Sequence, residues 1–157
     1  MSVATSLLTA CSGFLFAVLW MDLMFDAQVL RHRRAAGDLP ESVLASIADY
    51  YRRAVTGSRP MSRLIAVVMA VLLAALGFRL IRGHDPGGLA VASTLLAATP
   101  VLLALTRTVP NAARLGNRWG TSTDQTALAR SIWRDHVVCA GCMLAFLVLW
   151  VARPGWV

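Results

Sequence analysis

Four long apolar stretches, separated by arginine-rich segments, dominate the pattern of this chain. They cover residues 3–25, 64–81, 88–106 and 137–152. Each is close to the roughly 20 residues that a helix needs to cross a hydrocarbon core about 30 Å thick. The pattern therefore predicts an all-α protein, with residues 1–157 forming one domain that is an integral membrane four-helix bundle.

A shorter amphipathic helix is predicted between the first two spans, over residues 41–55. Its apolar positions, among them Ile47 and Tyr51, recur at four-residue spacing and so share one face. Asp38 followed by Glu41 is typical of a helix start. We expect this helix to lie on the membrane surface or against the cytoplasmic end of the bundle.

The segments that follow the third span differ in regularity. Residues 110–122 contain proline, glycine and asparagine, which favours an irregular connection. A long last helix is then predicted from about residue 124 to residue 152. At 1.5 Å per residue it would be about 43 Å long, so its first turns would project beyond the membrane.

Composition supports the membrane interpretation. Hydrophobic residues make up 57% of the chain and charged residues only 15%. A soluble bundle would carry a charged face on every helix, whereas residues 64–78 and 86–106 contain no charged residue at all. These two stretches favour the membrane bundle over the soluble alternative.

The net charge of +7 arises from arginine alone, and its distribution predicts the topology. Seven of the fifteen arginines lie between the first two spans and five lie between the last two. By the positive-inside rule, both long loops are cytoplasmic and both termini lie outside, as in a bacterial inner membrane. The charge is thereby explained by topology and by anionic lipids as partners, and it does not predict nucleic-acid binding.

Polar side chains gather near the predicted cytoplasmic end. Asp22 and Asp26 share one face of the first span, His136 stands where the last span begins, and Arg63 opens the second. A carboxylate at this depth needs a partner, here Arg63, Arg134 or His136. In one interpretation they form a polar pocket, in which His136 or Asp22 transfers protons and Asp26 and Arg63 contact a ligand. In the other they form a salt-bridge network that fixes helix register, and His136 reaches out to water.

The cysteines do not predict redox or metal chemistry. Cys139 and Cys142 form a CxxC pair, but electron relay would need a second pair, and the remaining cysteine, Cys11, lies toward the other side of the membrane. A metal site built from this pair with Asp135 and His136 lacks a second well-placed histidine. We therefore expect no metal and no cofactor.

Two short motifs resemble those of the anthrone-oxygenase-like family of small four-span membrane proteins, most of them without an assigned activity. They are Val-Pro-Asn, ending at Asn111, and Ser-Ile-Trp-Arg-Asp-His-Val over residues 131–137. The resemblance would cover nearly the whole chain, and it implies Asn111, Trp133 and His136 as site residues. Named members are implicated in cofactor-free oxidation of a polycyclic phenol to a quinone. That chemistry needs a base in an apolar pocket, here His136 or Asp22.

Two functions from different classes follow. In the first, the bundle binds or oxidises a lipophilic aromatic or quinone-like molecule at its cytoplasmic end. In the second, the chain is a non-catalytic accessory subunit that packs against a larger membrane complex or against copies of itself. A binding pocket should leave Asp22 and His136 facing a cavity, whereas a structural subunit should show both of them paired.

Overall fold

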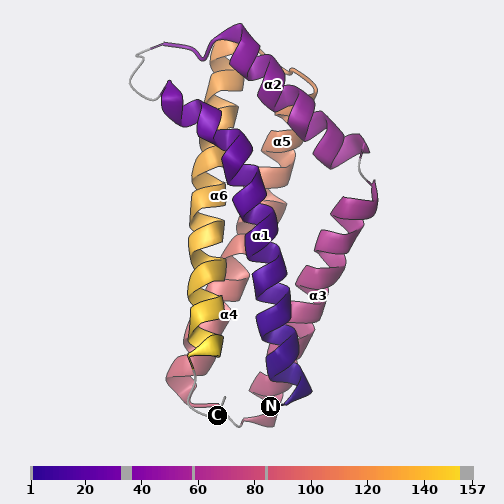
Figure 1. The fold of residues 1–157 in the computed structure, drawn as a ribbon, viewed down its shortest axis with the longest axis vertical. Coiled ribbons are helices and arrows are strands. Elements are labelled where there is room, and N and C mark those ends of the chain that lie inside the picture. The colour runs from indigo at the N-terminus through magenta and orange to yellow at the C-terminus, as the bar shows by residue number, and fades with distance from the viewer. Residues whose placement is uncertain (1, 33–36, 58, 84, 153–157) are drawn as a thin grey trace.

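The computed structural model describes residues 2–32, 37–57, 59–83 and 85–152, and within these the regular structure is entirely helical (Figure 1). The helices are α1 (Val3–Arg31), α2 (Glu41–Tyr51), α3 (Arg59–Arg82), α4 (Gly87–Leu103), α5 (Val109–Gly116) and α6 (Ser122–Val151). Two π-helical segments, η1 (Arg52–Gly57) and η2 (Ala104–Thr108), continue α2 and α4.

Among the described residues, four helical stretches are long and apolar enough to cross a membrane. They are Val3–Arg31, Pro60–Arg82, Gly87–Gly116 and Ser122–Val151. The all-α fold and the four candidate spans predicted from the sequence are therefore confirmed.

The helices form a bundle with two distinct ends. Helix α6 packs along α1 and α4, and α3 packs mainly against α1 (Figure 1). At one end α2 crosses the bundle and contacts α5; we call this the α2 end. The start of α1, the end of α6 and the connection from α3 to α4 lie together at the opposite end, which we call the α3–α4 end.

A capping box between Thr121 and Asp124 defines the start of helix α6. The Thr121 hydroxyl accepts a hydrogen bond from the Asp124 backbone N–H, and the Asp124 carboxylate accepts one from the Thr121 backbone N–H. This reciprocal capping satisfies two N–H groups that a helix start leaves unpaired. The predicted start near residue 124 is confirmed to within two residues.

The prediction that residues 110–122 are irregular is wrong over its first half. The chain remains helical through η2 and α5 as far as Gly116. Pro110 falls in the first turn of α5, where its missing N–H is tolerated. Gly116 then lies so close to η1 that a Cβ atom there would stand 2.9 Å from the Arg52 backbone nitrogen, which explains glycine at this position.

Helix α2 packs against the bundle end, one of the two places predicted for it. Its buried side chains include Leu44, Ile47 and Tyr51, which belong to an apolar cluster with Val29 of α1 and Ile132 of α6. The regular α-helix ends at Tyr51, earlier than the predicted residue 55, and becomes π-helical.

The predicted start signal of α2 does not cap the helix. Pro40 is the N-cap residue and provides no side-chain bond. Asp38 instead accepts a hydrogen bond from the Thr123 hydroxyl at 3.0 Å, and the Leu39 backbone N–H donates to the Thr126 hydroxyl at 3.0 Å. Tertiary contacts with α6, rather than a local cap, therefore position the start of α2.

A second apolar cluster fills the bundle from its middle to the α3–α4 end. It contains Leu8 and Leu15 of α1, Leu72 of α3, and Phe146 and Trp150 of α6. Between the two clusters lie buried polar side chains, Asp26 on α1 and Asp135 and His136 on α6. A polar layer thus separates two apolar ones.

An arginine ties three helices together at the α3–α4 end. The Arg79 guanidinium donates two bonds to the Asp85 carboxylate, at 2.8 and 2.6 Å, and two to the hydroxyls of Ser2 and Thr5, at 3.0 and 2.9 Å. It also lies over the Trp150 ring, 5.0 Å from the centroid. One largely buried side chain therefore joins α1, α3 and α6.

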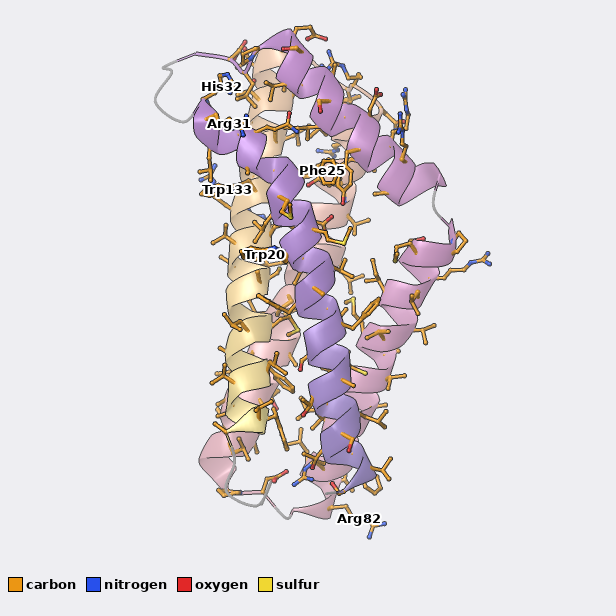
Figure 2. All side chains as sticks on the ribbon, viewed as in Figure 1. Trp20, Phe25, Arg31, His32, Arg82 and Trp133 are labelled. Carbon is orange, nitrogen blue, oxygen red and sulfur yellow. The ribbon has the colours of Figure 1, made fainter. Side chains whose placement is uncertain are left out.

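We expect Arg79→Gln to lower the free energy of unfolding by about 2 kcal/mol, because it leaves the buried Asp85 carboxylate without its guanidinium. Arg82→Gln is the matched control, since Arg82 is exposed and projects from the end of α3 (Figure 2). Thermal and chemical unfolding of both variants in detergent would measure the difference. Equal losses in the two variants would contradict this role of Arg79.

Candidate functional site

The polar layer centres on Asp26 of α1, which is 1% exposed. Its Oδ2 lies 2.7 Å from Nδ1 of His136 on α6, and its Oδ1 accepts a hydrogen bond of 2.6 Å from the Tyr51 hydroxyl on α2. Three helices that are distant in sequence therefore meet at one carboxylate. Buried charges require such partners, and Asp26 has two.

The bond to Asp26 fixes how His136 can act. Because Nδ1 faces a carboxylate at hydrogen-bond distance, we assign the proton to Nδ1, which donates it to Asp26. Among the described residues no group forms a hydrogen bond with Nε2. A carboxylate thus orients an imidazole whose second nitrogen is available to accept a proton.

The alternative that His136 reaches out to water is wrong. The residue is 6% exposed and is held inside the bundle by Asp26.

Asp22 forms a second, outer pair one helical turn away. It accepts a hydrogen bond of 2.5 Å from the Tyr50 hydroxyl. The Tyr50 ring stacks on Phe25, with centroids 4.1 Å apart and planes at 15°, on the side of α1 that faces α2 (Figure 2). Both members of this pair are only half-buried.

The two phenols of α2 serve as hydrogen-bond donors. Burial raises the pKa of Tyr50, and the hydrogen bond to the Asp22 carboxylate raises it further. Burial and the Asp26 carboxylate raise the pKa of Tyr51 in the same way. Both hydroxyls therefore keep their protons at neutral pH and donate to the carboxylates.

Asp135, which precedes His136, has partners of its own. Its side chain is buried and lies 3.6 Å from the Arg107 guanidinium and 3.5 Å from the Thr108 hydroxyl. Arg107 also donates to the Ser131 hydroxyl at 3.2 Å. These contacts join η2 to α6 beside the layer. In the described part of the chain, no group of three or more His, Cys, Asp or Glu side chains has a geometry that could hold a metal ion.

The structure brings together Asp22, Asp26 and His136, and it leaves the other candidate residues apart. Asn111 on α5 and Trp133 on α6 are half-buried, and Arg63 on α3 is exposed. Within the described residues, none of these three forms a hydrogen bond or an ion pair with the cluster. Their role as ligand contacts stays a prediction.

Two of the three predicted partners for the carboxylates are wrong. Arg134 is exposed and bonds the Arg130 carbonyl, and Arg63 is exposed as well. Of the predicted partners, His136 is the one that pairs with Asp26.

Sequence reasoning missed Tyr50 and Tyr51 as polar partners. The four-residue spacing places Tyr51 on the apolar face of its helix and says nothing of its hydroxyl. A signal was present, because consecutive tyrosines on a helix that docks near two carboxylates one turn apart can supply one hydroxyl to each.

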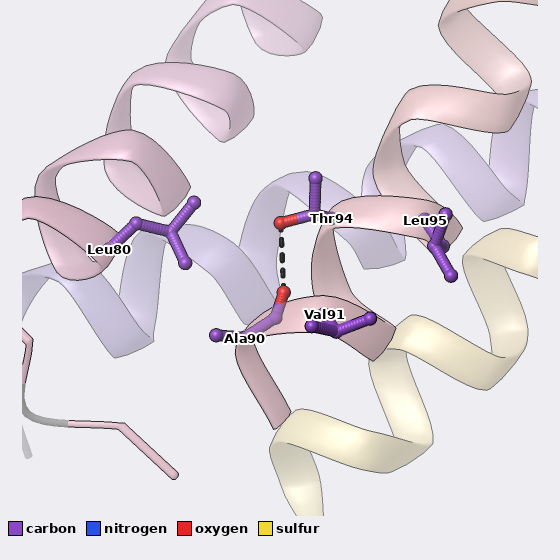
Figure 3. Close-up of a pocket in the computed structure, with 5 residues that line it drawn as sticks. All are labelled: Leu80, Ala90, Val91, Thr94 and Leu95. Carbon is purple, nitrogen blue, oxygen red and sulfur yellow. Dashed lines mark hydrogen bonds between the residues drawn. The ribbon is translucent and has the colours of Figure 1, made fainter. Parts of the chain in front are cut away.

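An open apolar groove of about 270 Å³ lies at the opposite end of the bundle (Figure 3). Its lining consists of Leu80, Ala90, Val91, Thr94 and Leu95. The one hydroxyl there donates to the Ala90 carbonyl of its own helix at 2.8 Å. The groove is therefore separate from the polar layer and contributes no titratable group.

In comparisons with known proteins, the chain matches no protein-family model, no curated protein and no solved structure. The resemblance to the anthrone-oxygenase-like family consequently stays a prediction.

We expect Asp26→Asn to cost about 2 kcal/mol of unfolding free energy and Asp22→Asn about 1 kcal/mol. Asp26 is fully buried and accepts two hydrogen bonds, whereas Asp22 is half-buried and accepts one. The two variants remove the same charge from the same helix face, so each controls for the other. Chemical unfolding in detergent would rank them, and the reverse order would contradict the layered arrangement.

Proposed function

We propose that this protein binds a lipophilic aromatic molecule with an acidic hydroxyl at the α2 end of its bundle, and oxidises it to a quinone-like product. One observation carries the proposal: Asp26 holds His136 in place while Nε2 has no hydrogen-bond partner among the described residues. A histidine so arranged is suited to general-base chemistry. The resemblance noted in the sequence adds the substrate class.

In the proposed reaction, His136 Nε2 takes the proton of the substrate hydroxyl. Asp26 stabilises the imidazolium that forms, as the carboxylate of a catalytic triad does. The phenolate is electron-rich, and dioxygen is its oxidant. One oxygen atom of dioxygen becomes the second carbonyl of the quinone, and the other leaves as water with the two hydrogens that the phenol loses.

The surroundings of the layer favour such a step. Apolar clusters lie on both sides of it along α1 and α6. Apolar walls exclude water and strengthen the electrostatic contact between a phenolate and an imidazolium.

The proposed orientation places the α2 end in the cytoplasm of a bacterial cell. Exposed arginines at this end include Arg53, Arg107, Arg114 and Arg134. Their excess over the α3–α4 end is the bias that orients membrane helices. The substrate would reach the layer from the cytoplasmic leaflet, where lipophilic phenols collect.

A fluorescent phenol, 2-naphthol, tests the proposal. Protein in lipid nanodiscs should lower the pKa of bound 2-naphthol, because protonated His136 stabilises the naphtholate, and the naphtholate absorbance band reports the change. His136→Gln should abolish the shift. Cys142→Ser on the same helix is the control and should retain it.

If bound 2-naphthol titrates identically in the unmodified protein and in His136→Gln, the role of His136 as base is refuted.

A second candidate is the accessory subunit, and it too has a specific observation in its favour. Asp22 and His136 are both paired, Asp22 with Tyr50 and His136 with Asp26, which is the arrangement expected of a structural subunit. Under this proposal Asp22→Asn and His136→Gln would lower thermal stability while neither variant nor unmodified protein perturbs 2-naphthol. The same preparations therefore separate the two functions.

A further inference from the structure

Two phenol–carboxylate pairs stand side by side at the α2 end, and they differ in accessibility. The inner pair, Tyr51 with Asp26, is 4% and 1% exposed and also engages His136. The outer pair, Tyr50 with Asp22, is half-buried and has no histidine bound to it. Phe25, on which the Tyr50 ring stacks, is 43% exposed.

The outer group has the elements that a phenolic ligand requires. Asp22 offers a carboxylate acceptor at 2.5 Å from a phenol oxygen, and Phe25 offers a ring face at 4.1 Å. The Tyr50 side chain makes both contacts. The protein's own phenol therefore occupies the acceptor and the ring face that would recognise a phenolic ligand.

We infer that the Tyr50 side chain holds the place of the ligand: a planar phenol displaces it, donates its hydroxyl to Asp22 and stacks on Phe25. This inference rests on the proposed function and assigns a binding position and an internal competitor to it. The exchange replaces one phenol–carboxylate hydrogen bond and one stacked ring pair by others of the same kind. The remaining cost is that of turning Tyr50 away, which breaks its edge contact with the Tyr51 ring at 5.3 Å, and of immobilising the ligand.

This position precedes the proton transfer. Asp22 accepts there the same hydroxyl proton that His136 takes in the proposed reaction, so a phenol at Asp22 keeps its proton, as Tyr50 does, until the hydroxyl leaves Asp22. The inner pair keeps His136 oriented throughout, because Tyr51 and Asp26 take no part in the exchange.

A purely structural role for Tyr50 makes a different prediction. The Gln28 side chain also contacts Ser46, at 3.4 Å, so Tyr50 could simply be one of the contacts that fasten α2 to α1. In that case its removal would loosen α2 without improving the binding of any phenol.

The experiment compares two probes in full-length protein in lipid nanodiscs, 2-naphthol and 2-methoxynaphthalene, which lacks the hydroxyl donor. Tyr50→Phe removes the competing hydroxyl and should tighten 2-naphthol binding roughly tenfold, because one charge-assisted hydrogen bond need no longer be broken. Binding of 2-methoxynaphthalene should not change. Tyr51→Phe is the matched control and should not tighten either probe, because its carboxylate lies behind the outer pair.

A second measurement uses the unmodified protein and does not depend on how the variant folds. Adding 2-naphthol should shift the carboxylate stretching band of Asp22 in the infrared difference spectrum, and Asp22→Asn should remove that signal. Unchanged affinity in Tyr50→Phe, equal tightening of both probes, or an infrared difference that survives in Asp22→Asn would each overturn the inference.

The failures can be told apart. If 2-naphthol shows the His136-dependent pKa shift while the Tyr50 and Asp22 measurements show no effect, the proposed function is supported and the displacement of Tyr50 by the ligand is refuted. If 2-naphthol binds to no variant, both fall together.

Discussion

A carboxylate buried at the meeting point of three helices is the constraint on which the α2 end depends. Removing Asp26 from water without partners would cost several kcal/mol, more than a small bundle can lose and remain stable. It is satisfied by one donor from α6 and one from α2. The docking of α2 across the bundle is therefore required by the chemistry of a residue on α1, in addition to the burial of its own apolar face.

Polar contacts also set the register of the long helices. In a bilayer, apolar side chains pack about as well against lipid as against one another, so there the two leucine-rich clusters would provide little preference for one helix alignment over another. Hydrogen bonds of fixed geometry do provide it. Asp26 with His136 aligns α1 with α6 at one end, and Arg79 with Ser2 and Thr5 aligns α3 with α1 at the other.

The sequence was most informative where composition alone decides the outcome. The four spans and the last helix follow from uncharged runs and a local capping signal, and the structure has them at the predicted places. Asp22, Asp26 and His136 could be grouped because alternating spans bring them to one depth. Their partners could not be chosen, since the choice depends on which way each helix faces: Arg63 and Arg134 are exposed, whereas the tyrosines of α2 reach the carboxylates. The helical course through Pro110 also escaped prediction, because it depends on π-helical widening in η2 and on the contact of Gly116 with η1.

The same hydrogen bonds can serve stability and chemistry because the two carboxylates are unequal. Asp26 has both oxygens bonded and no exposure, so it can orient a base but has no oxygen left for a ligand. Asp22 holds the Tyr50 phenol at the edge of the layer, and under our proposal it would exchange this phenol for a ligand without exposing the inner group. A site with only the inner carboxylate would be rigid but closed, and one with only the outer carboxylate would be open but would leave the histidine unoriented. Placing the two one turn apart on α1 separates these tasks, and this is how the proposed function reconciles a fully paired cluster with binding.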